Sequence, residues 1–358
     1  MSRSWTGSAG AASTPSSGSS RGRRSTTSCS ATATTPCPAG GGRSTTAGTR
    51  SRACSSRLCT KSADATDRPG ANRRWLLLGA SGLVGTHLRL ALTGRDVVMT
   101  FHRDAVPGGV PLDLADHDAI ARVVGEARPD IVVVAAADAF VERCEREPVA
   151  TRAVNVEALR RIADAAPNAL LVVFSSEYVF DGRSGPYAED DPVSPINEYG
   201  RQKVDVERIA RDRADHLVLR VSGVYGWSKA RTSFVTQLVD KLRARERFTV
   251  PSDQLITPTP APDLARAVVE LVDLGARGTY HAAGPEILER PEFARRAAAA
   301  FGLDAGLLDL MPTADLGLKA PRPLRAGLRT EVLRRALGHG LAPSAEALAA
   351  MREREPAR

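Results

Sequence analysis

Two groups of residues in this chain have types and spacing that could do chemistry. Tyr199 and Lys203 lie four positions apart, so on a helix their side chains would share one face. An ammonium beside a phenol lowers the pKa of the phenol from about 10. We therefore predict that Tyr199 is a proton donor and that Lys203 lowers its pKa. The second group is the glycine run LLGASGLVG at residues 77–85, which is typical of a dinucleotide-binding turn.

The glycine run has the sequence context that such a turn requires. It follows a short apolar stretch at 75–78 and opens an apolar-periodic segment at 83–93, which predicts a strand, a turn and a helix. Gly79 would make the tight turn, Gly82 would let the backbone approach a pyrophosphate, and Gly85 would let the helix pack closely. An ordinary glycine-rich turn is the alternative. We expect the cofactor contacts of this loop to come from Gly79, Ser81, Gly82, Leu83, Val84 and Gly85.

Apolar and amphipathic segments alternate between residues 75 and 221. This alternation is typical of an α/β fold with a Rossmann-type, doubly wound parallel sheet. The predicted strands are 75–78, 97–101, 131–135, 170–174 and 217–221, with helices near 83–93, 116–127, 148–165 and 197–212.

After residue 221 the pattern loosens, and helices are expected near 233–245, 263–273 and 291–301. This part predicts a small C-terminal lobe that caps the carboxyl ends of the strands, where ligands bind. We therefore divide the chain into a disordered tail, an NAD(P)-binding core, and a part that is mainly substrate-binding lobe and C-terminal helices: residues 1–72, 73–225 and 226–358.

The residues after the second predicted strand bear on the choice of cofactor. An acid at this position usually meets an unphosphorylated ribose, whereas an arginine suits a 2′-phosphate. His102 and Arg103 stand there, so NADP(H) is favoured over NAD(H). Asp104 keeps the alternative open, because a slip of one residue would put an acid near the ribose. A solvated loop charge is the other interpretation of Arg103.

Other candidate residues follow the later strands. Asp113 and Leu114 would end a short third strand between 97–101 and 131–135, near the adenine, so that 131–135 is the fourth strand and 170–174 the fifth. Small side chains after the fourth strand would let the cofactor lie against the backbone, and these are Ala135, Ala136 and Ala137. Ser176 would end the fifth strand, where its hydroxyl could hydrogen-bond a substrate carbonyl. Their shared placement at carboxyl ends of strands favours one common site.

The first 72 residues differ in composition from the rest of the chain. They contain 28 Ser or Thr, 10 basic and 2 acidic residues, and almost no large apolar residue, so they cannot bury a core. A disordered arm, a transit peptide and a stretch translated from a start codon placed too early are the interpretations left open. The other 286 residues contain 39 basic and 39 acidic residues. The net charge of +8 therefore gives no reason to expect a nucleic-acid partner.

Cysteine and histidine placement gives no sign of a metal site. Four of the five cysteines lie in the tail without a zinc-like spacing, and the six histidines show no ligand pairing. Cys144 is alone in the rest of the chain, which fits a reducing compartment. No apolar run approaches the roughly 20 residues of a membrane span. We therefore predict a cytoplasmic protein with neither a metal ion nor a membrane partner.

A block of short motifs resembles a known family. FSSEYVFDG at 174–182, GPY at 185–187, EDDP at 189–192 and PINEYGRQK at 195–203 are similar to the dTDP-4-dehydrorhamnose reductases. These belong to the nucleotide-sugar branch of the extended short-chain dehydrogenases/reductases, whose glycine motif has the same GxxGxxG spacing. Shorter similar pieces follow the family order, so the resemblance covers roughly residues 73–300: AVN at 153–155, VYG at 224–226, DQ at 253–254 and PT at 258–259.

The resemblance implies an NADPH-dependent reductase of a nucleotide-linked 4-keto-6-deoxysugar, as in dTDP-rhamnose biosynthesis. By this resemblance Ser176 takes the place of the catalytic Ser/Thr, Tyr199 that of the proton donor, and Lys203 that of its activator, which also holds the nicotinamide ribose. Hydride would go to the keto carbon while Tyr199 protonates the developing alkoxide. The implied partner is a nucleotide sugar. The oligomeric state stays open, with a homodimer as one candidate.

Some residues depart from the family pattern. The chain has GLVG at 82–85 where the family commonly has GQLG, and RVSGVY at 220–225 lacks an aromatic ring that packs on the sugar.

The chain also resembles the regulatory beta subunit of methionine adenosyltransferase, which shares the fold, the arginine and the YxxxK pair. An NADP-binding regulatory or sugar-nucleotide-binding protein is therefore an alternative, as is a nucleotide-sugar epimerase or dehydratase. A reductase releases NADP in each cycle, an epimerase keeps its nicotinamide, and a regulatory subunit needs a large partner surface.

The composition of the tail generates one prediction. Because residues 1–72 cannot bury a core, protein that lacks them is expected to fold and to bind NADPH as the full chain does. Thermal melting and NADPH titration of both forms measure this. A large loss of melting temperature on truncation would contradict it, because the tail would then contribute packing.

Overall fold

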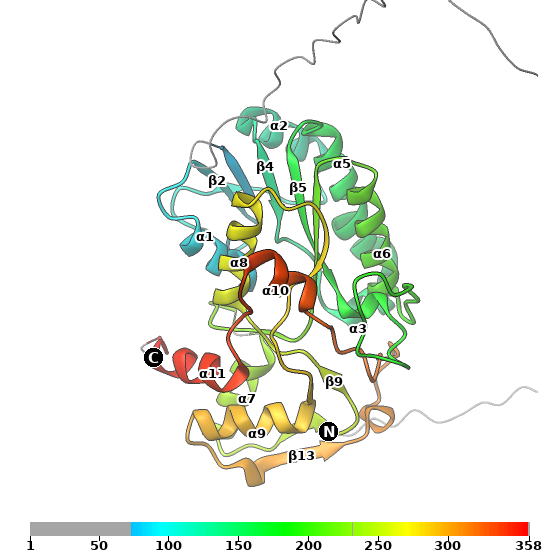
Figure 1. Ribbon diagram of the computed structural model, residues 1–358, viewed down its shortest axis with the longest axis vertical. Coiled ribbons are helices and arrows are strands. Elements are labelled where there is room, and N and C mark those ends of the chain that lie inside the picture. Colours follow the sequence, from blue (N-terminus) through cyan, green and yellow to red (C-terminus); the bar gives the residue numbers. More distant parts are fainter. Residues whose placement is uncertain (1–72, 231, 357–358) are drawn as a thin grey trace, which may run out of the picture. The chain divides into compact units, whose positions relative to one another are not determined.

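The computed structural model describes residues 73–230 and 232–356 (Figure 1). The prediction of a disordered tail over residues 1–72 lies outside this part of the chain. Within it, a parallel sheet forms the central layer, and helices cover both of its faces.

The central sheet has seven parallel strands in the order β11-β6-β5-β4-β1-β2-β3. The order reverses between β1 and β4, which is where doubly wound sheets bind ligands. The predicted Rossmann-type fold is therefore confirmed. The strands are β1 (Trp75–Leu78), β2 (Val97–Phe101), β3 (Val110–Pro111), β4 (Ile131–Val134), β5 (Leu170–Ser176), β6 (His216–Val221) and β11 (Gly278–His281).

Alternation along the strands builds two hydrophobic cores, one on each face of the sheet. Trp75 and Leu77 of β1 belong to one core, and Leu76 and Leu78 belong to the other. Successive side chains of a strand point to opposite faces, so a fully apolar strand must be covered on both. Figure 1 shows the helices on the two sides. The first core is covered by α1 (Leu83–Ala91), α8 (Ala261–Asp273) and α10 (Glu331–Leu337), and the second by α2 (His117–Ala127), α5 (Ala158–Ala165) and α6 (Glu198–Arg211).

The segment predicted as one helix over 148–165 is more complex. It begins as α4 (Pro148–Arg152), widens into the π-helical turn η2 (Ala153–Glu157) and continues as α5. The side chain of Asn155 in this turn donates to the Asp138 carbonyl at 2.9 Å and to Gln202 Oε1 at 2.8 Å. π-Helical turns are common at functional sites. A short helix that was not predicted precedes it, namely α3 (Val141–Arg146).

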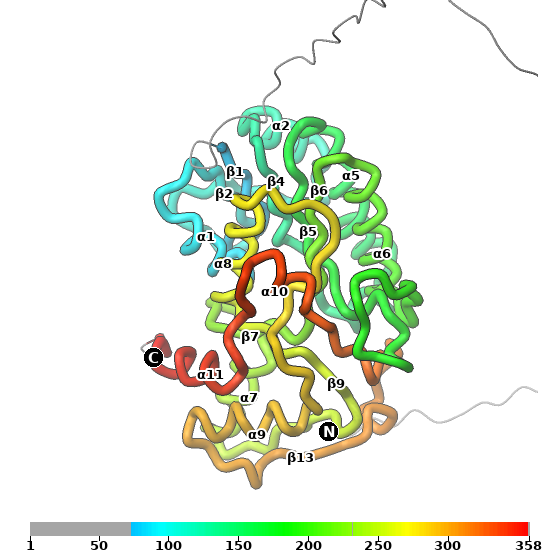
Figure 2. Tube along the Cα trace, in the orientation of Figure 1, coloured from blue at the N-terminus to red at the C-terminus, as the bar shows by residue number. Residues whose placement is uncertain are grey.

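A second group of elements packs around a separate apolar core that includes Val235, Leu238, Phe293 and Met351. In the tube view, α7, α9 and α11 lie together beyond the main sheet (Figure 2). α8 and β11 fall in the same stretch of sequence but pack with the main sheet. The elements are α7 (Phe234–Arg243), α9 (Arg290–Ala300), α11 (Ser344–Glu353) and the strand pairs β7 (Val224–Tyr225) with β10 (Thr259–Pro260), β9 (Leu255–Ile256) with β12 (Leu288–Glu289), and β8 (Phe248–Pro251) with β13 (Leu308–Met311); short helices are η3 (Glu177–Val179), η4 (Ala305–Leu307) and η5 (Thr313–Leu316).

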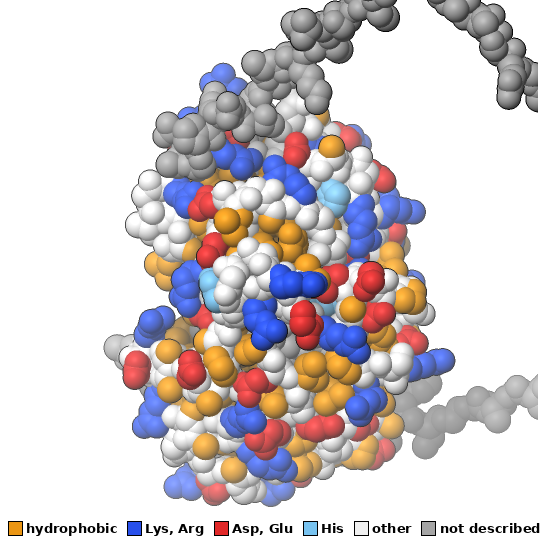
Figure 3. Space-filling model, viewed as in Figure 1, with side chains coloured by type: hydrophobic (Ala, Val, Ile, Leu, Met, Phe, Trp, Pro, Cys, Tyr) orange, Lys and Arg blue, Asp and Glu red, His pale blue; other side chains and the backbone are white. Residues whose placement is uncertain are grey.

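Charges of both signs are mixed on the surface. Figure 3 shows Lys and Arg side chains interspersed with Asp and Glu over the face in view, which agrees with the balanced charge of residues 73–358. Among the described helices, none has the length and apolarity that crossing a bilayer requires.

A buried ion pair fixes α6 to the sheet. Glu207 of α6 and Arg220 of β6 are both almost fully buried, and Arg220 donates to both carboxylate oxygens at 2.8 and 2.9 Å. Ser175 of β5 also donates to Glu207, at 2.5 Å, and so does Arg211, at 2.7 Å. Burial alone would raise the pKa of Glu207, but the bonds and the charge of Arg220 lower it overall. Glu207 therefore stays ionised and joins α6 to β5 and β6.

Removal of Glu207 should destabilise the fold strongly. Glu207→Ala leaves Arg220 buried without its partner, which typically costs about 3–5 kcal/mol of unfolding free energy. Chemical denaturation followed by circular dichroism measures this. Glu246→Ala is the matched control, because Glu246 is half-exposed in an ion pair with Lys241 and should change the free energy by less than about 1 kcal/mol. Equal losses in the two variants would contradict the role of the buried pair.

Candidate active site

The glycine turn between β1 and α1 has little room for larger residues. Gly79 has a φ of +85°, and a Cβ there would lie 2.7 Å from the backbone nitrogen of Ala136. A Cβ on Gly85 would lie 2.0 Å from the Gly79 carbonyl oxygen, so α1 packs directly against the turn. Gly82 is exposed, and its Cβ position meets only the Gly79 carbonyl, at 3.4 Å. The open side of the turn is therefore at Gly82.

The start of α1 fits a dinucleotide pyrophosphate. The first N–H groups of a helix have no acceptor within the helix and attract anions. Gly82 occupies the N-cap position and makes no side-chain cap bond, and the first turn of α1 has no acidic residue. Ser81, Leu83 and Val84 are half-buried around this position. The residues present therefore match the predicted phosphate cradle.

Charged side chains gather after β2 and β3. His102 and Arg103 follow β2 and are exposed, and His102 Nε2 lies 3.7 Å from a carboxylate oxygen of Asp113, which follows β3. Asp104 pairs instead with Lys229, whose Nζ lies 3.0 Å from Asp104 Oδ1. The strand β3 ends at Pro111, two residues before Asp113. The predicted adenosine-side residues thus lie at one edge of the sheet.

A small cavity joins several of the other predicted residues. Leu114, Ala136, Ala137 and Lys203 line it together with Asn155 and Phe174. Ala135 ends the ladder of β4 by donating its N–H to the Leu78 carbonyl at 3.0 Å. Because Gly79 packs on Ala136, the cavity lies next to the glycine turn. The structure thus brings the predicted turn, the alanines after β4 and Lys203 together.

The three candidate catalytic side chains lie at the end of β5 and the start of α6. The hydroxyl of Ser176 lies close enough to the phenol of Tyr199 to lower its pKa, and Ser176 Oγ accepts the N–H of Tyr178 at 3.3 Å. Lys203 Nζ donates to the Phe174 carbonyl at 2.9 Å and lies 5.6 Å from the centre of the Tyr199 ring. All three side chains are nearly buried.

The predicted lowering of the Tyr199 pKa is wrong. Burial raises the pKa of Tyr199, and the hydrogen bond from Ser176 opposes this only in part. The sequence prediction considered the ammonium of Lys203 alone and could not include the loss of water around the phenol. Tyr199 therefore keeps its proton at neutral pH, as a proton donor must.

Burial acts in the opposite direction on Lys203, because desolvation disfavours a charged ammonium. The pKa of Lys203 falls to about 8, with the charge of Glu207 opposing the shift. Lys203 is therefore still charged in most molecules at pH 7. Burial raises the pKa of the Cys144 thiol to about 11, so that group stays neutral.

Gly200 and Asn197 are structural requirements of the site that sequence reasoning did not assign. A Cβ on Gly200 would lie 2.2 Å from the Tyr178 carbonyl oxygen, so only glycine lets α6 approach the chain after Ser176 this closely. Asn197 caps α6 by accepting the Gly200 N–H at 2.8 Å, and it donates to the Pro321 carbonyl at 2.8 Å. The sequence does contain a signal for this cap, because Asn is a common N-cap residue and Asn197 stands at the start of the helix predicted over 197–212.

Glu177 is a second unassigned residue, directly after Ser176. Its side chain is buried, and one carboxylate oxygen has no hydrogen-bond partner among the described residues. Burial raises the pKa of Glu177 to about 7, while a hydrogen bond with Ser222 and the charge of Arg290 oppose the rise. No pattern in the sequence predicted this burial, because it depends on the packing of distant segments.

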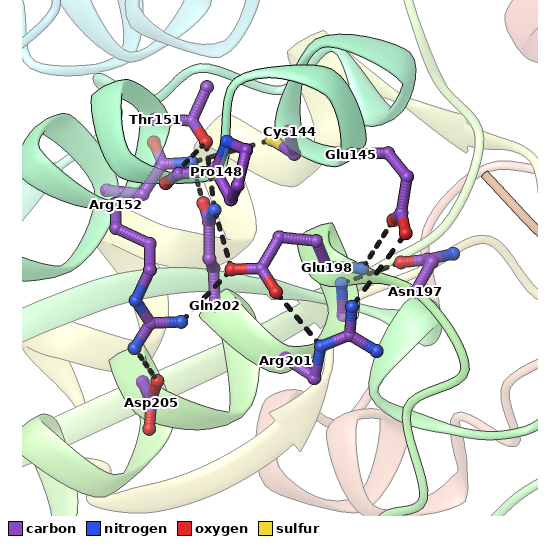
Figure 4. Close-up of polar contacts among 12 residues, drawn as sticks. Cys144, Glu145, Pro148, Thr151, Arg152, Asn197, Glu198, Arg201, Gln202 and Asp205 are labelled. Atoms are coloured by element: carbon purple, nitrogen blue, oxygen red, sulfur yellow. Dashed lines mark hydrogen bonds and ion pairs between the residues drawn. The ribbon is translucent and has the colours of Figure 1, made fainter. Parts of the chain in front are cut away.

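The opposite face of α6 is tied to α3, α4 and the π-helical turn (Figure 4). Arg152 pairs with Glu198 at 3.1 Å and with Asp205, and Gln202 donates to Thr151 Oγ1 at 2.9 Å. The N–H of Glu198 donates to Glu145 at 2.8 Å. These contacts fix the first two turns of α6, which carry Tyr199 and Lys203.

A larger cavity of about 480 Å³ lies between α1, α8 and α11. His87, Tyr225, Asp263 and Met351 are among its lining residues, and none of the predicted site residues lines it. It is therefore separate from the candidate active site. Among the described residues, no group of three or more His, Cys, Asp or Glu could hold a metal ion.

Comparison with known proteins places this geometry in a family. The family model described as the RmlD substrate binding domain matches residues 73–355. The probable low-salt glycan biosynthesis reductase Agl14 of Haloferax volcanii is 34% identical over 263 residues, which cover 70% of this chain and 87% of the relative. The methionine adenosyltransferase 2 subunit beta of Danio rerio is 33% identical over 266 residues, which cover 72% and 82%.

A solved structure agrees with both the fold and the resemblance. The dTDP-4-dehydrorhamnose reductase of Bacillus anthracis in complex with NADP superposes with a TM-score of 0.71 at 26% identity, covering 78% of this chain and 98% of that one. The family resemblance in residues 174–203 is thereby confirmed. The relatives include both reductases and a subunit of methionine adenosyltransferase. With a family model matched from residue 73 to residue 355, this chain belongs to the family of the RmlD substrate binding domain.

Proposed function

We propose that the protein is an NADPH-dependent reductase of a nucleotide-linked 4-keto-6-deoxysugar. The observation that carries this proposal is the placement of Ser176, Tyr199 and Lys203. The hydroxyl of Ser176 at the end of β5 lies by the hydroxyl of Tyr199 at the start of α6, and the Lys203 ammonium follows one helical turn further along α6. Such a pair can hold a carbonyl oxygen and protonate it, which a reduction to an alcohol requires. A cytoplasmic location and a homodimer stay predictions.

The residues that would hold the cofactor follow the strand ends. The turn at residues 79–85 and the start of α1 would bind the pyrophosphate, and Lys203 would bind the nicotinamide ribose. Arg103 would bind the 2′-phosphate, while Ala136 and Ala137 leave room for the cofactor against the backbone. NADPH, when bound, supplies the hydride. A related structure is a complex with NADP, which supports the choice of cofactor class.

The protein's own residues would control the proton. Burial keeps the phenol of Tyr199 protonated, so the group has a proton to donate when an alkoxide develops. Ser176 would orient the carbonyl through its hydroxyl, and Lys203 would then stabilise the phenolate left behind. The Lys203 ammonium lies close enough to the Tyr199 ring for this electrostatic effect.

A regulatory or sugar-nucleotide-binding role without turnover is the second candidate. The relative named methionine adenosyltransferase 2 subunit beta, at 33% identity, favours it. An epimerase or dehydratase on the same scaffold is a further alternative, since folds host many chemistries. These candidates differ from the reductase in one measurable respect, which is net oxidation of NADPH in the presence of a keto sugar.

Replacement of the proton donor tests the proposal. Tyr199→Phe keeps the buried ring but removes the hydroxyl, so NADPH binding should stay nearly unchanged. Oxidation of NADPH with a dTDP-4-keto-6-deoxysugar should slow by at least about a hundredfold, the usual contribution of a positioned general acid. Tyr187→Phe is the control, because Tyr187 is another buried tyrosine that instead bonds Asp181 at 2.5 Å.

The assay follows NADPH absorbance with a panel of nucleotide-linked 4-keto sugars. Loss of rate in Tyr199→Phe but not in Tyr187→Phe supports the assignment of Tyr199. If the unmutated protein binds NADPH and reduces no member of the panel, the reductase proposal fails and the binding-protein candidate replaces it.

The pKa of Lys203 predicts a pH dependence of cofactor binding. Below about pH 8 the ammonium is charged and can bind the ribose hydroxyls, and above it the charge is lost. NADPH affinity should therefore fall by up to about tenfold between pH 7 and pH 9. Cys144 and Tyr199 titrate above this range, because burial raises both pKa values.

Lys203→Arg is the matched control for this titration, since a guanidinium keeps its charge throughout the range. Its NADPH affinity should be nearly independent of pH. An equal pH dependence in the unmutated protein and in Lys203→Arg would remove Lys203 as the titrating group.

A further inference from the structure

The loop after β7 joins two parts of the cofactor site that are distant in sequence. It starts against α1, where the carbonyl of Trp227 lies 3.1 Å from His87 Nε2 and a Cβ on Gly226 would lie 3.6 Å from Leu83 Cδ1. Two residues later, Lys229 reaches the chain after β2, where its Nζ lies 3.0 Å from Asp104 Oδ1. The loop therefore crosses from the phosphate-binding helix to the predicted ribose end of the site.

The contact with Asp104 matters because the Asp104 carboxylate would repel the 2′-phosphate of a phosphorylated ribose. Arg103 and Asp104 are adjacent, and a carboxylate there would repel a 2′-phosphate that Arg103 attracts. The side chain of Asp104 is half-exposed. Lys229 places a positive charge directly on this carboxylate, with its own side chain 79% exposed.

We propose that Lys229 sets the cofactor preference by neutralising Asp104. The ion pair offsets the negative charge of Asp104 beside Arg103, so that Arg103 can attract a 2′-phosphate. This inference rests on the proposed NADPH-binding function and adds a specificity residue from a loop outside the glycine turn and the strand ends. The pair itself contributes little to folding, since both side chains are at the surface.

Titration of NADPH and NADH against full-length variants tests the proposal without any turnover. Lys229→Ala should weaken NADPH binding by about five- to tenfold, because Asp104 then repels the 2′-phosphate, and should change NADH affinity by less than about twofold. The double variant Lys229→Ala/Asp104→Ala should recover NADPH affinity to within about twofold of the unmutated protein. Higher salt should shrink the effect of Lys229→Ala, because exposed charges are screened.

Lys241→Ala is the control, since Lys241 forms a comparable exposed ion pair with Glu246 on the C-terminal lobe. It should leave both cofactor affinities unchanged. Unaltered NADPH affinity in Lys229→Ala overturns the proposal, and so does a loss that the second substitution fails to restore, because Lys229 would then act by another contact. Neither outcome bears on reductase turnover, which is measured with the keto-sugar panel.

Discussion

Helix α6 buries polar side chains against the sheet at three successive turns, and the rest of the site depends on how those groups are satisfied. Tyr199, Lys203 and Glu207 follow one another at intervals of four residues on one face. A buried polar group without a partner is costly, so each must find one. Three consecutive residues of β5 meet them: the hydroxyl of Ser176 lies by Tyr199, the carbonyl of Phe174 accepts from Lys203, and the hydroxyl of Ser175 donates to Glu207. This matching fixes the position of α6 along β5, and it places the phenol beside the serine hydroxyl.

The residues proposed to bind the cofactor differ from the buried groups of α6, because they are exposed to solvent. In the proposed function, the glycine turn would act by leaving space, and the residues after β2 and β3 would act through charge. Their effect on affinity would then be modest in each case and sensitive to salt. The deep part of the site would set the geometry for proton transfer, whereas the exposed part would set which dinucleotide is favoured. The two parts meet at the cavity lined by Ala136 and Lys203.

Local pattern was enough to predict the architecture. The strands at 75–78 and 97–101 were predicted with the bounds that the structure has, because apolar runs between turn residues are a local signal. Effects of packing between distant segments were not predictable. The direction of the Tyr199 pKa shift, the π-helical turn at Asn155 and the burial of Glu177 all depend on such packing. The Lys229 contact with Asp104 joins residues from separate strand ends, and no spacing in the sequence indicates it.

In the proposed reaction, NADPH bound to this chain gives its hydride to a sugar carbonyl. Its most direct test uses NADPH with deuterium at the transferable position of the nicotinamide, incubated with full-length protein and a dTDP-4-keto-6-deoxysugar. Mass spectrometry and NMR of the sugar product then locate the label. If the chain is a reductase, we expect one deuterium at C4 of the sugar for each NADPH oxidised. A sugar that is recovered unchanged, or one that is altered without carrying deuterium, would contradict the proposed reductase function.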